Sequence, residues 1–178
     1  AIILPMENKK APAAKKKNEF LEWVKSLAIA VFVALMVRAF LFEFVVVKQT
    51  SMYPTLEPEQ KLGLFKCAYL FSEPKHDDVV VIKIYNEKDY VKRVIAVAGQ
   101  TVEIKDSRVY INSVELEEPY LVEGLVYSDY GPCSVPEGYI FVMGDNRPSS
   151  IDSRVLGLIS TSRLKGKVIF RVYPFRFF

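Results

Sequence analysis

Histidine is nearly absent from this sequence: the 178 residues include one histidine, two cysteines and one tryptophan. A Ser/His/Asp triad needs a histidine base, and a structural zinc site needs closely spaced cysteines or histidines. His76 lies in the turn-like segment Pro74-Lys75-His76-Asp77, and Cys67 and Cys133 are far apart in the chain. We therefore expect no metal, no cofactor and no catalytic triad of this kind.

Two outcomes are open for Cys67 and Cys133. In an extracytoplasmic domain the oxidising environment would allow a disulfide between them. A disulfide requires Cα atoms within about 7 Å of each other, and the alternative is two separate thiols.

Charge of one sign is also scarce, because the net charge is only +3. Such a small excess argues against nucleic acid as a partner. The lysines are nevertheless concentrated ahead of an apolar segment, which is typical of a cytoplasmic flank. We expect a basic cytoplasmic tail over residues 1–19, with Met6 as a natural start and residues 1–5 as an upstream start or a remnant of expression. The lysines of this flank are Lys9, Lys10, Lys15, Lys16, Lys17 and Lys25.

Residues 20–44 are predicted to form a membrane-spanning anchor. Ser26 to Phe42 is apolar on every helical face except at Ser26 and Arg38. At about 1.5 Å per residue this stretch spans about 26 Å, and the apolar flanks extend it toward a hydrocarbon core of about 30 Å. Arg38 is tolerable near the outer end, where its side chain can reach the interface. The alternatives are a buried helix of a soluble protein and a cleaved signal peptide, although no Ala-x-Ala site follows the apolar run.

Residues 45–178 are expected to form a mainly β extracytoplasmic domain. Short segments rich in Val, Ile, Phe and Tyr recur, and helix signals are scarce beyond residue 56. A hairpin is expected over residues 101–111, and a cap or long loop near residues 105–136, where Gly and Pro cluster. The expected strands are Lys61 to Leu70, Val79 to Tyr85, Tyr90 to Val97, Thr101 to Ile104, Arg108 to Ile111, Tyr139 to Met143 and Lys167 to Tyr173.

A serine and a lysine are the candidate catalytic pair. Ser51 follows the apolar segment in Thr50-Ser51-Met52-Tyr53-Pro54, and Lys92 lies within the β-type run Tyr90-Val91-Lys92-Arg93-Val94. A serine hydroxyl needs a base, and a lysine can act as one if burial lowers its pKa from about 10.4 toward about 8. Lys92 suits this role because alternate side chains of a strand face the packed interior, whereas Arg93 would point to the opposite face. Taken alone, such a pair is more often a surface serine and a solvated lysine.

A third segment supplies the context for this pair. Gly144-Asp145-Asn146-Arg147-Pro148-Ser149-Ser150-Ile151-Asp152-Ser153-Arg154 follows an expected strand and is dense in turn-forming and charged residues. Loops at strand ends often carry site residues on a rigid scaffold. The plain alternative is a polar turn that satisfies its own backbone, and both can hold together.

The three segments, in this order behind a basic tail and one apolar span, resemble bacterial type I signal peptidases, above all the small single-span form of Gram-positive bacteria. The resemblance covers Lys9 to Pro174. It implies a signal-peptidase-like β-barrel or β-sandwich, anchored in the cell membrane, with the N-terminus cytoplasmic. It also implies a serine endopeptidase that removes signal peptides from exported preproteins after small residues, without metal or nucleic acid.

The resemblance assigns roles to individual residues. It implies Ser51 as nucleophile, Lys92 as general base and Ser150 as the residue that orients the lysine amine. Met52 and Pro54 shape the site, and the Ser51 backbone N–H supplies one oxyanion donor. Asp145, Asp152 and Arg154 are implied as structural residues near the site, with Asp152 and Arg154 as an ion pair.

The sequence also departs from the family pattern. Gln49 stands where many relatives have Ser or Gly, so a second oxyanion donor from its amide is a weaker expectation. Ala98-Gly99-Gln100 replaces Pro-Gly-Asp, and Ser107 stands at a common Gly position, which affects turns more than chemistry.

Other functions remain as alternatives at this stage. One is an inactive membrane-anchored β-rich binding protein of the same family, against which the intact Ser51, Lys92 and Ser150 argue. A self-cleaving repressor shares the dyad but needs a helical DNA-binding domain, and a sortase-like enzyme needs a Cys/His pair. If Lys92 is the base, activity is expected to rise toward alkaline pH.

Overall fold

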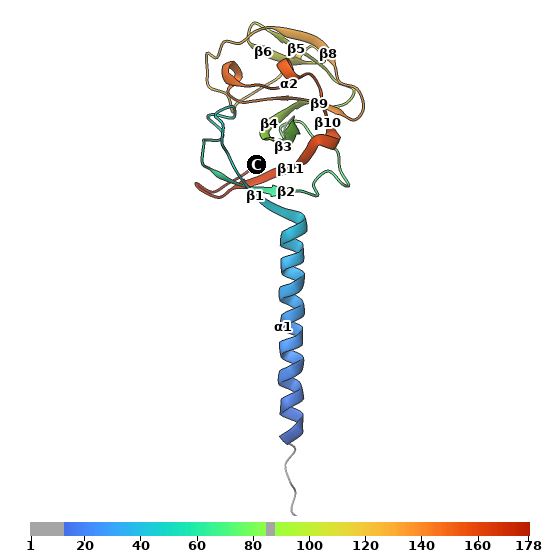
Figure 1. Cartoon of the computed structure of the whole chain (residues 1–178). Coiled ribbons are helices and arrows are strands. Elements are labelled where there is room, and N and C mark those ends of the chain that lie inside the picture. The colour runs from blue at the N-terminus through green and yellow to red at the C-terminus, as the bar shows by residue number, and fades with distance from the viewer. Residues whose placement is uncertain (1–12, 85–87) are drawn as a thin grey trace, which may run out of the picture. The chain divides into compact units, whose positions relative to one another are not determined.

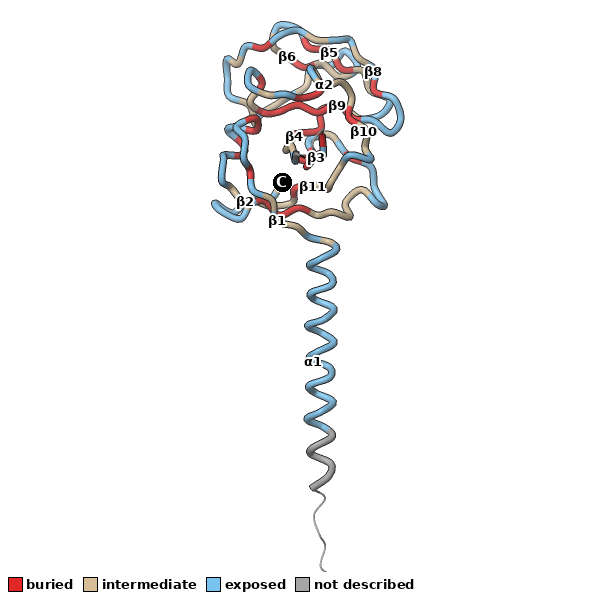
Figure 2. The backbone as a smooth tube through the Cα atoms, viewed as in Figure 1, coloured by how far each residue is buried: buried red, intermediate tan, exposed pale blue. Residues whose placement is uncertain are grey.

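The structure is a computed structural model that describes residues 13–84 and 88–178, in two compact units divided between Phe40 and Leu41. The first unit contains most of helix α1 (Ala13–Leu41). Residues 19–40 are exposed along this helix (Figure 2). Glu19–Leu41 is long and apolar enough to cross a membrane.

The helix differs at both ends from the expected anchor over residues 20–44. Residues 13–19, assigned to the tail, are helical because Ala, Lys and Glu favour helix, and residues 1–12 lie outside the described part of the chain. At the other end Phe42–Val46 forms strand β1 instead of a last helical turn. Its aromatic and β-branched residues pair with a neighbouring strand, and this pairing outweighs continuation of the helix.

The second unit contains a large antiparallel sheet in the order β1-β2-β11-β3-β4-β9-β10, with β12 paired to β11 (Figure 1). Its central strands are rich in buried Val and Ile, which fit a pleated surface covered on both faces. After β1, its strands are β2 (Lys61–Phe65), β3 (Val79–Ile84), β4 (Lys88–Ala96), β9 (Tyr139–Met143), β10 (Ile159–Ser160), β11 (Leu164–Arg171) and β12 (Arg176–Phe177).

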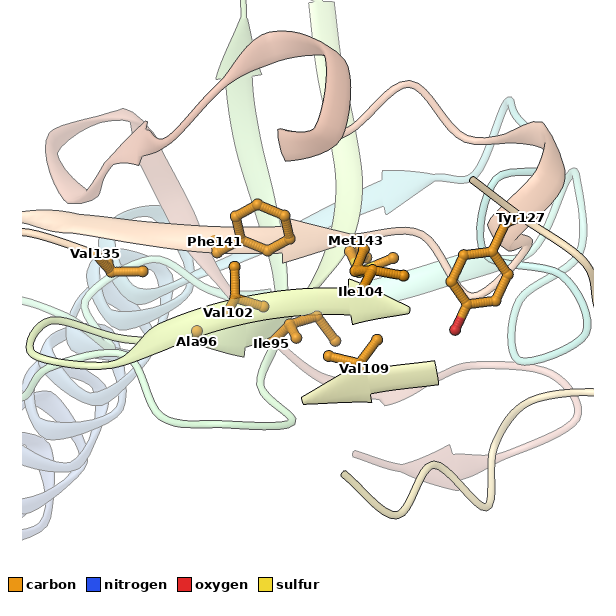
Figure 3. Packing of buried hydrophobic residues seen from close by; sticks show 9 residues of the cluster. All are labelled: Ile95, Ala96, Val102, Ile104, Val109, Tyr127, Val135, Phe141 and Met143. Carbon is orange, nitrogen blue, oxygen red and sulfur yellow. The ribbon is translucent and has the colours of Figure 1, made fainter. Parts of the chain in front are cut away.

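A smaller antiparallel sheet follows the order β7-β6-β5-β8, made of β5 (Thr101–Lys105), β6 (Arg108–Ile111), β7 (Val114–Glu115) and β8 (Tyr130–Ser134). One buried cluster joins the two sheets (Figure 3). Ile95 and Phe141 come from the large sheet, whereas Val102 and Ile104 come from the small one. Tyr127 belongs to the same cluster, so the segment before β8 is attached to this core.

The expected mainly β domain behind an N-terminal apolar helix is therefore confirmed, with differences in detail. β6 and β9 have the expected bounds, whereas β2 ends at Phe65 because a turn follows where a strand to Leu70 was expected. β8 was assigned to a loop because it contains Gly131 and Pro132. It is an edge strand, where a proline needs no ladder partner for its nitrogen.

The β5–β6 hairpin has a tight turn with positive φ at both Asp106 (50°) and Ser107 (60°). Turns of this kind favour Gly or Asn at such positions. The Ser107 hydroxyl accepts a hydrogen bond from the Tyr127 N–H (3.0 Å) and donates one to the Tyr127 carbonyl (3.2 Å). Serine in place of glycine thus connects the turn to the segment before β8.

Candidate active site

Ser51 begins the turn that follows β1, and only 7% of its surface is exposed. Met52 and Leu56 anchor this turn, because both side chains are buried in a hydrophobic cluster. Asn146 makes two hydrogen bonds to the backbone of the turn. Its N–H donates to the Ser51 carbonyl (3.0 Å) and its Nδ2 donates to the Thr50 carbonyl (3.1 Å). The Ser51 side chain is therefore presented from a fixed backbone.

Lys92 lies on β4 opposite Val80 of β3 and is fully buried. Its Nζ donates a hydrogen bond to the Ser51 Oγ at 2.6 Å. Burial lowers the pKa of Lys92 to about 8, although the negative charges of Asp152 and Asp145 oppose this decrease and Arg154 reinforces it. About a tenth of this amine is therefore uncharged at pH 7 and about half at pH 8, and the uncharged form can accept a proton.

Arg93 and Asp145 form a buried ion pair next to the dyad. The Arg93 guanidinium donates to both Asp145 carboxylate oxygens, from Nε at 2.9 Å and from Nη2 at 2.7 Å. Burial alone would lower the pKa of Arg93, but Asp145 raises it. Asp145 thus fixes the start of the 144–154 loop to β4, immediately beside Lys92.

Asp145→Asn is expected to lower the free energy of unfolding by about 3 kcal/mol, because it leaves the buried Arg93 charge without its carboxylate. The matched control is Glu103→Gln. Glu103 pairs with Lys105, whose side chain is 61% exposed, and such pairs contribute less than about 1 kcal/mol. Chemical denaturation of the two variants measures the difference, and equal stabilities would contradict a structural role for Asp145.

Asp152 and Arg154 form the ion pair expected from the sequence, with 2.8 Å between Arg154 Nη2 and Asp152 Oδ2. Asp152 also accepts hydrogen bonds from the backbone N–H groups of Gly144 (3.0 Å) and Arg154 (3.2 Å), and the latter caps helix α2 (Ser153–Leu156). Burial would raise the pKa of Asp152, but Arg154 lowers it. The carboxylate closes the loop by connecting its two ends.

Ser150 lies at the site, but its hydroxyl is buried and has no hydrogen-bond partner among the described residues. The expected contact that would orient Lys92 is therefore not formed in this structure.

A cavity of about 400 Å³ lies beside Ser51, and both Ser51 and Ser150 line it. Gln49 is exposed and also lines this cavity. Met52, which is buried, and Pro54 are not part of the lining. Tyr90 also lines the cavity, and the sequence analysis did not identify it as a site residue. It lies two residues before Lys92 and therefore on the same face of the strand, with its ring centroid 5.8 Å from Lys92 Nζ. The remaining lining residues are Thr50, Pro148, Ser149 and Ile151.

Cys67 and Cys133 are not joined in a disulfide. Within the described residues no group of His, Cys, Asp and Glu is arranged to hold a metal ion.

Comparison with known proteins identifies the family of this chain. The family model described as "Signal peptidase, peptidase S26" matches residues 20–173. The chain belongs to the signal peptidase family. A signal peptidase I of Bacillus licheniformis is 45% identical over 175 residues, covering 92% of this chain and 94% of the relative. Signal peptidase I T of Bacillus subtilis (strain 168) is 45% identical over 179 residues, covering 94% and 93%.

Among solved structures, a signal peptidase I of Enterococcus faecalis V583 has 31% sequence identity and a TM-score of 0.49, covering 55% of this chain and 97% of that one. The match to the family model includes the apolar helix as well as the β domain.

Proposed function

We propose that Ser51 and Lys92 are the catalytic dyad of a membrane-anchored serine endopeptidase that removes signal peptides from exported preproteins. The hydrogen bond of 2.6 Å between a buried amine and a buried hydroxyl is the observation that carries this proposal. Membership of the signal peptidase family supports the reaction type and the substrate class. No observation favours an inactive binding protein.

The first half of the reaction forms an ester. The uncharged Lys92 amine removes the proton from Ser51 Oγ as this oxygen attacks the scissile carbonyl carbon. The negative charge that develops on the carbonyl oxygen is stabilised by the Ser51 N–H, and the exposed Gln49 amide is the proposed second donor. The C–N bond then breaks as the Lys92 ammonium returns the proton to the leaving amine, which releases the mature protein.

The second half hydrolyses the ester. Lys92 removes a proton from a water molecule that attacks the ester carbon, and the same proton then returns to Ser51 Oγ. The signal peptide leaves with a new carboxylate. We propose that Ser150 assists by turning its unpartnered hydroxyl toward the Lys92 amine during these transfers.

The substrate would lie extended along the cavity, with its backbone paired to an exposed strand edge and small side chains before the cut. The apolar helix would hold the enzyme in the cell membrane with the N-terminus cytoplasmic, confining enzyme and substrate to one plane. Under this proposal the anchor provides local concentration and the β domain provides the chemistry.

The direct test uses the full chain in detergent micelles or vesicles with a preprotein that carries an Ala-x-Ala cleavage site. Mass spectrometry of the products should show one cut after the second alanine. An intact preprotein, or cuts scattered through the mature region, would contradict the proposal.

A further inference from the structure

The loop that carries Ser150 borders two cavities. Pro148 and Ser150 line the active-site cavity and also a second cavity of about 410 Å³, whose wall includes Tyr127, Arg154 and Val155. Pro148 and Ser149 are exposed at the tip of the loop, whereas the polar residues Asp145 and Arg147 are buried. Polar contacts must therefore hold it in place.

Arg147 provides several of these contacts from inside the loop. Its side chain is fully buried, and its Nε donates to the Gly144 carbonyl at 3.1 Å. Its Nη1 donates to the Tyr127 hydroxyl at 3.2 Å, while its own carbonyl accepts a hydrogen bond of 2.7 Å from Arg154 Nη2. Arg147 thus connects the start of the loop, its end and Tyr127. Tyr127 is a member of the core cluster drawn in Figure 3.

Glu118 neutralises this buried cation from a different part of the chain. Its side chain is 8% exposed, and its two carboxylate oxygens accept hydrogen bonds from Nη1 and Nη2 of Arg147. Burial alone would lower the pKa of Arg147, but Glu118 raises it. Without Glu118 the guanidinium would be a buried, uncompensated charge, which is strongly unfavourable.

Tyr120 connects the same network to Arg93, the neighbour of Lys92 in the chain. Its hydroxyl donates to Glu118 Oε1 at 2.9 Å, and its ring lies 3.8 Å from the Arg93 guanidinium carbon. Arg93 holds Asp145, so the ion pairs of Asp145 and Arg147 are joined through the segment that follows β7.

The loop in turn bears directly on the nucleophile. A methyl group added to Gly144 would lie 2.3 Å from the Ser51 carbonyl oxygen, which shows how closely the two backbones meet. Asn146 donates to this same oxygen. A shift of the 144–147 backbone would therefore displace Ser51 relative to Lys92.

We propose that Glu118 is a positioning residue for the reaction at Ser51, acting through Arg147 on the Gly144–Ser150 loop. Glu118 itself does not contact the dyad. The inference rests on the proposed function, because positioning has meaning only if Ser51 and Lys92 react. It gives the segment between β7 and β8 a role in catalysis, beyond a cap on the small sheet.

The test compares Glu118→Gln with Glu115→Gln in the full-length enzyme, using steady-state cleavage of a peptide with an Ala-x-Ala site. Glu115 pairs with Arg108 in the same region, but both side chains are about half exposed or more. Displacement of reacting groups by about 1 Å costs on the order of 100-fold in rate. We expect Glu118→Gln to lower kcat by about 10- to 100-fold with KM within about threefold, and Glu115→Gln to match the wild type.

Conservative variants separate positioning from general loss of structure. Glu118→Asp keeps the charge and should recover part of kcat, whereas Arg147→Lys keeps the charge but loses the Nε contact with Gly144 and should remain as slow as Glu118→Gln. Assays are run well below the thermal midpoint of each variant. If Glu118→Gln cannot be purified folded, Tyr120→Phe decides, since loss of its hydroxyl should lower kcat about threefold at unchanged KM.

Three outcomes are possible. A fall in kcat with KM retained supports the inference. Wild-type kcat in folded Glu118→Gln, or in Tyr120→Phe where that variant decides, overturns it while leaving the dyad intact. A wild-type enzyme that cleaves no preprotein overturns the proposed function, and the inference with it.

Discussion

Replacement of Ser51 by alanine is expected to lower preprotein cleavage by at least about 10⁴-fold, because the variant has no atom that can attack the scissile carbonyl. The fold should be retained, since the change removes one hydroxyl whose partner is the Lys92 amine. Gel-based cleavage of a preprotein, together with thermal unfolding of both proteins, measures the two quantities.

The matched control is Ser128→Ala, which alters an exposed serine outside the lining of the active-site cavity. Its cleavage rate should stay within about threefold of the wild type, as expected for a surface substitution. Measurable turnover by folded Ser51→Ala, free of contaminating wild-type enzyme, would exclude Ser51 as the nucleophile.

Lys92→Met is expected to abolish cleavage and also to stabilise the protein. Methionine has a similar volume and no charge, so the base is lost without a cavity. In the wild type the folded-state pKa of about 8 lies below the ordinary value, so the unfolded chain binds more protons between these two values. Stability therefore rises with pH across this window, and below about pH 8 the folded protein carries the full cost of the buried amine.

This cost is at most about 3 kcal/mol for a pKa shift of this size. Below pH 8, Lys92→Met should therefore unfold at a higher temperature or denaturant concentration than the wild type, and the difference should shrink as the pH approaches 10. Lys83→Met, at an exposed position of β3, should change neither activity nor stability by much. Normal cleavage by Lys92→Met would exclude Lys92 as the base.

Local sequence patterns were sufficient to predict much of the fold. Arg108–Ile111 and Tyr139–Met143 have the bounds expected from β-branched and aromatic runs. Residues 42–44 were assigned to the helix because an apolar run extends equally well as helix or strand, and the choice is made by pairing with β2. Tyr130–Ser134 was missed because Gly131 and Pro132 indicate a loop unless the strand is known to lie at an edge.

The sequence was sufficient to predict which residues belong to the candidate site, but not the contacts that hold them in place. Motif order and the two-residue strand period identified Ser51 and Lys92 as candidates. The contacts that hold their surroundings come from distant positions, such as Glu118 with Arg147 and Asn146 with Ser51. No local sequence pattern predicts these long-range contacts, because they depend on how the fold brings separate segments together.

The central claim is that an uncharged Lys92 amine removes the proton of Ser51. The pH dependence of kcat/KM, measured with a peptide that has no group titrating between pH 6 and 10, tests it most directly. We expect activity to rise with pH and to level off, with a midpoint near the lowered Lys92 pKa of about 8. A flat profile over this range, or a rise only near the ordinary lysine value of about 10.4, would contradict a buried lysine base.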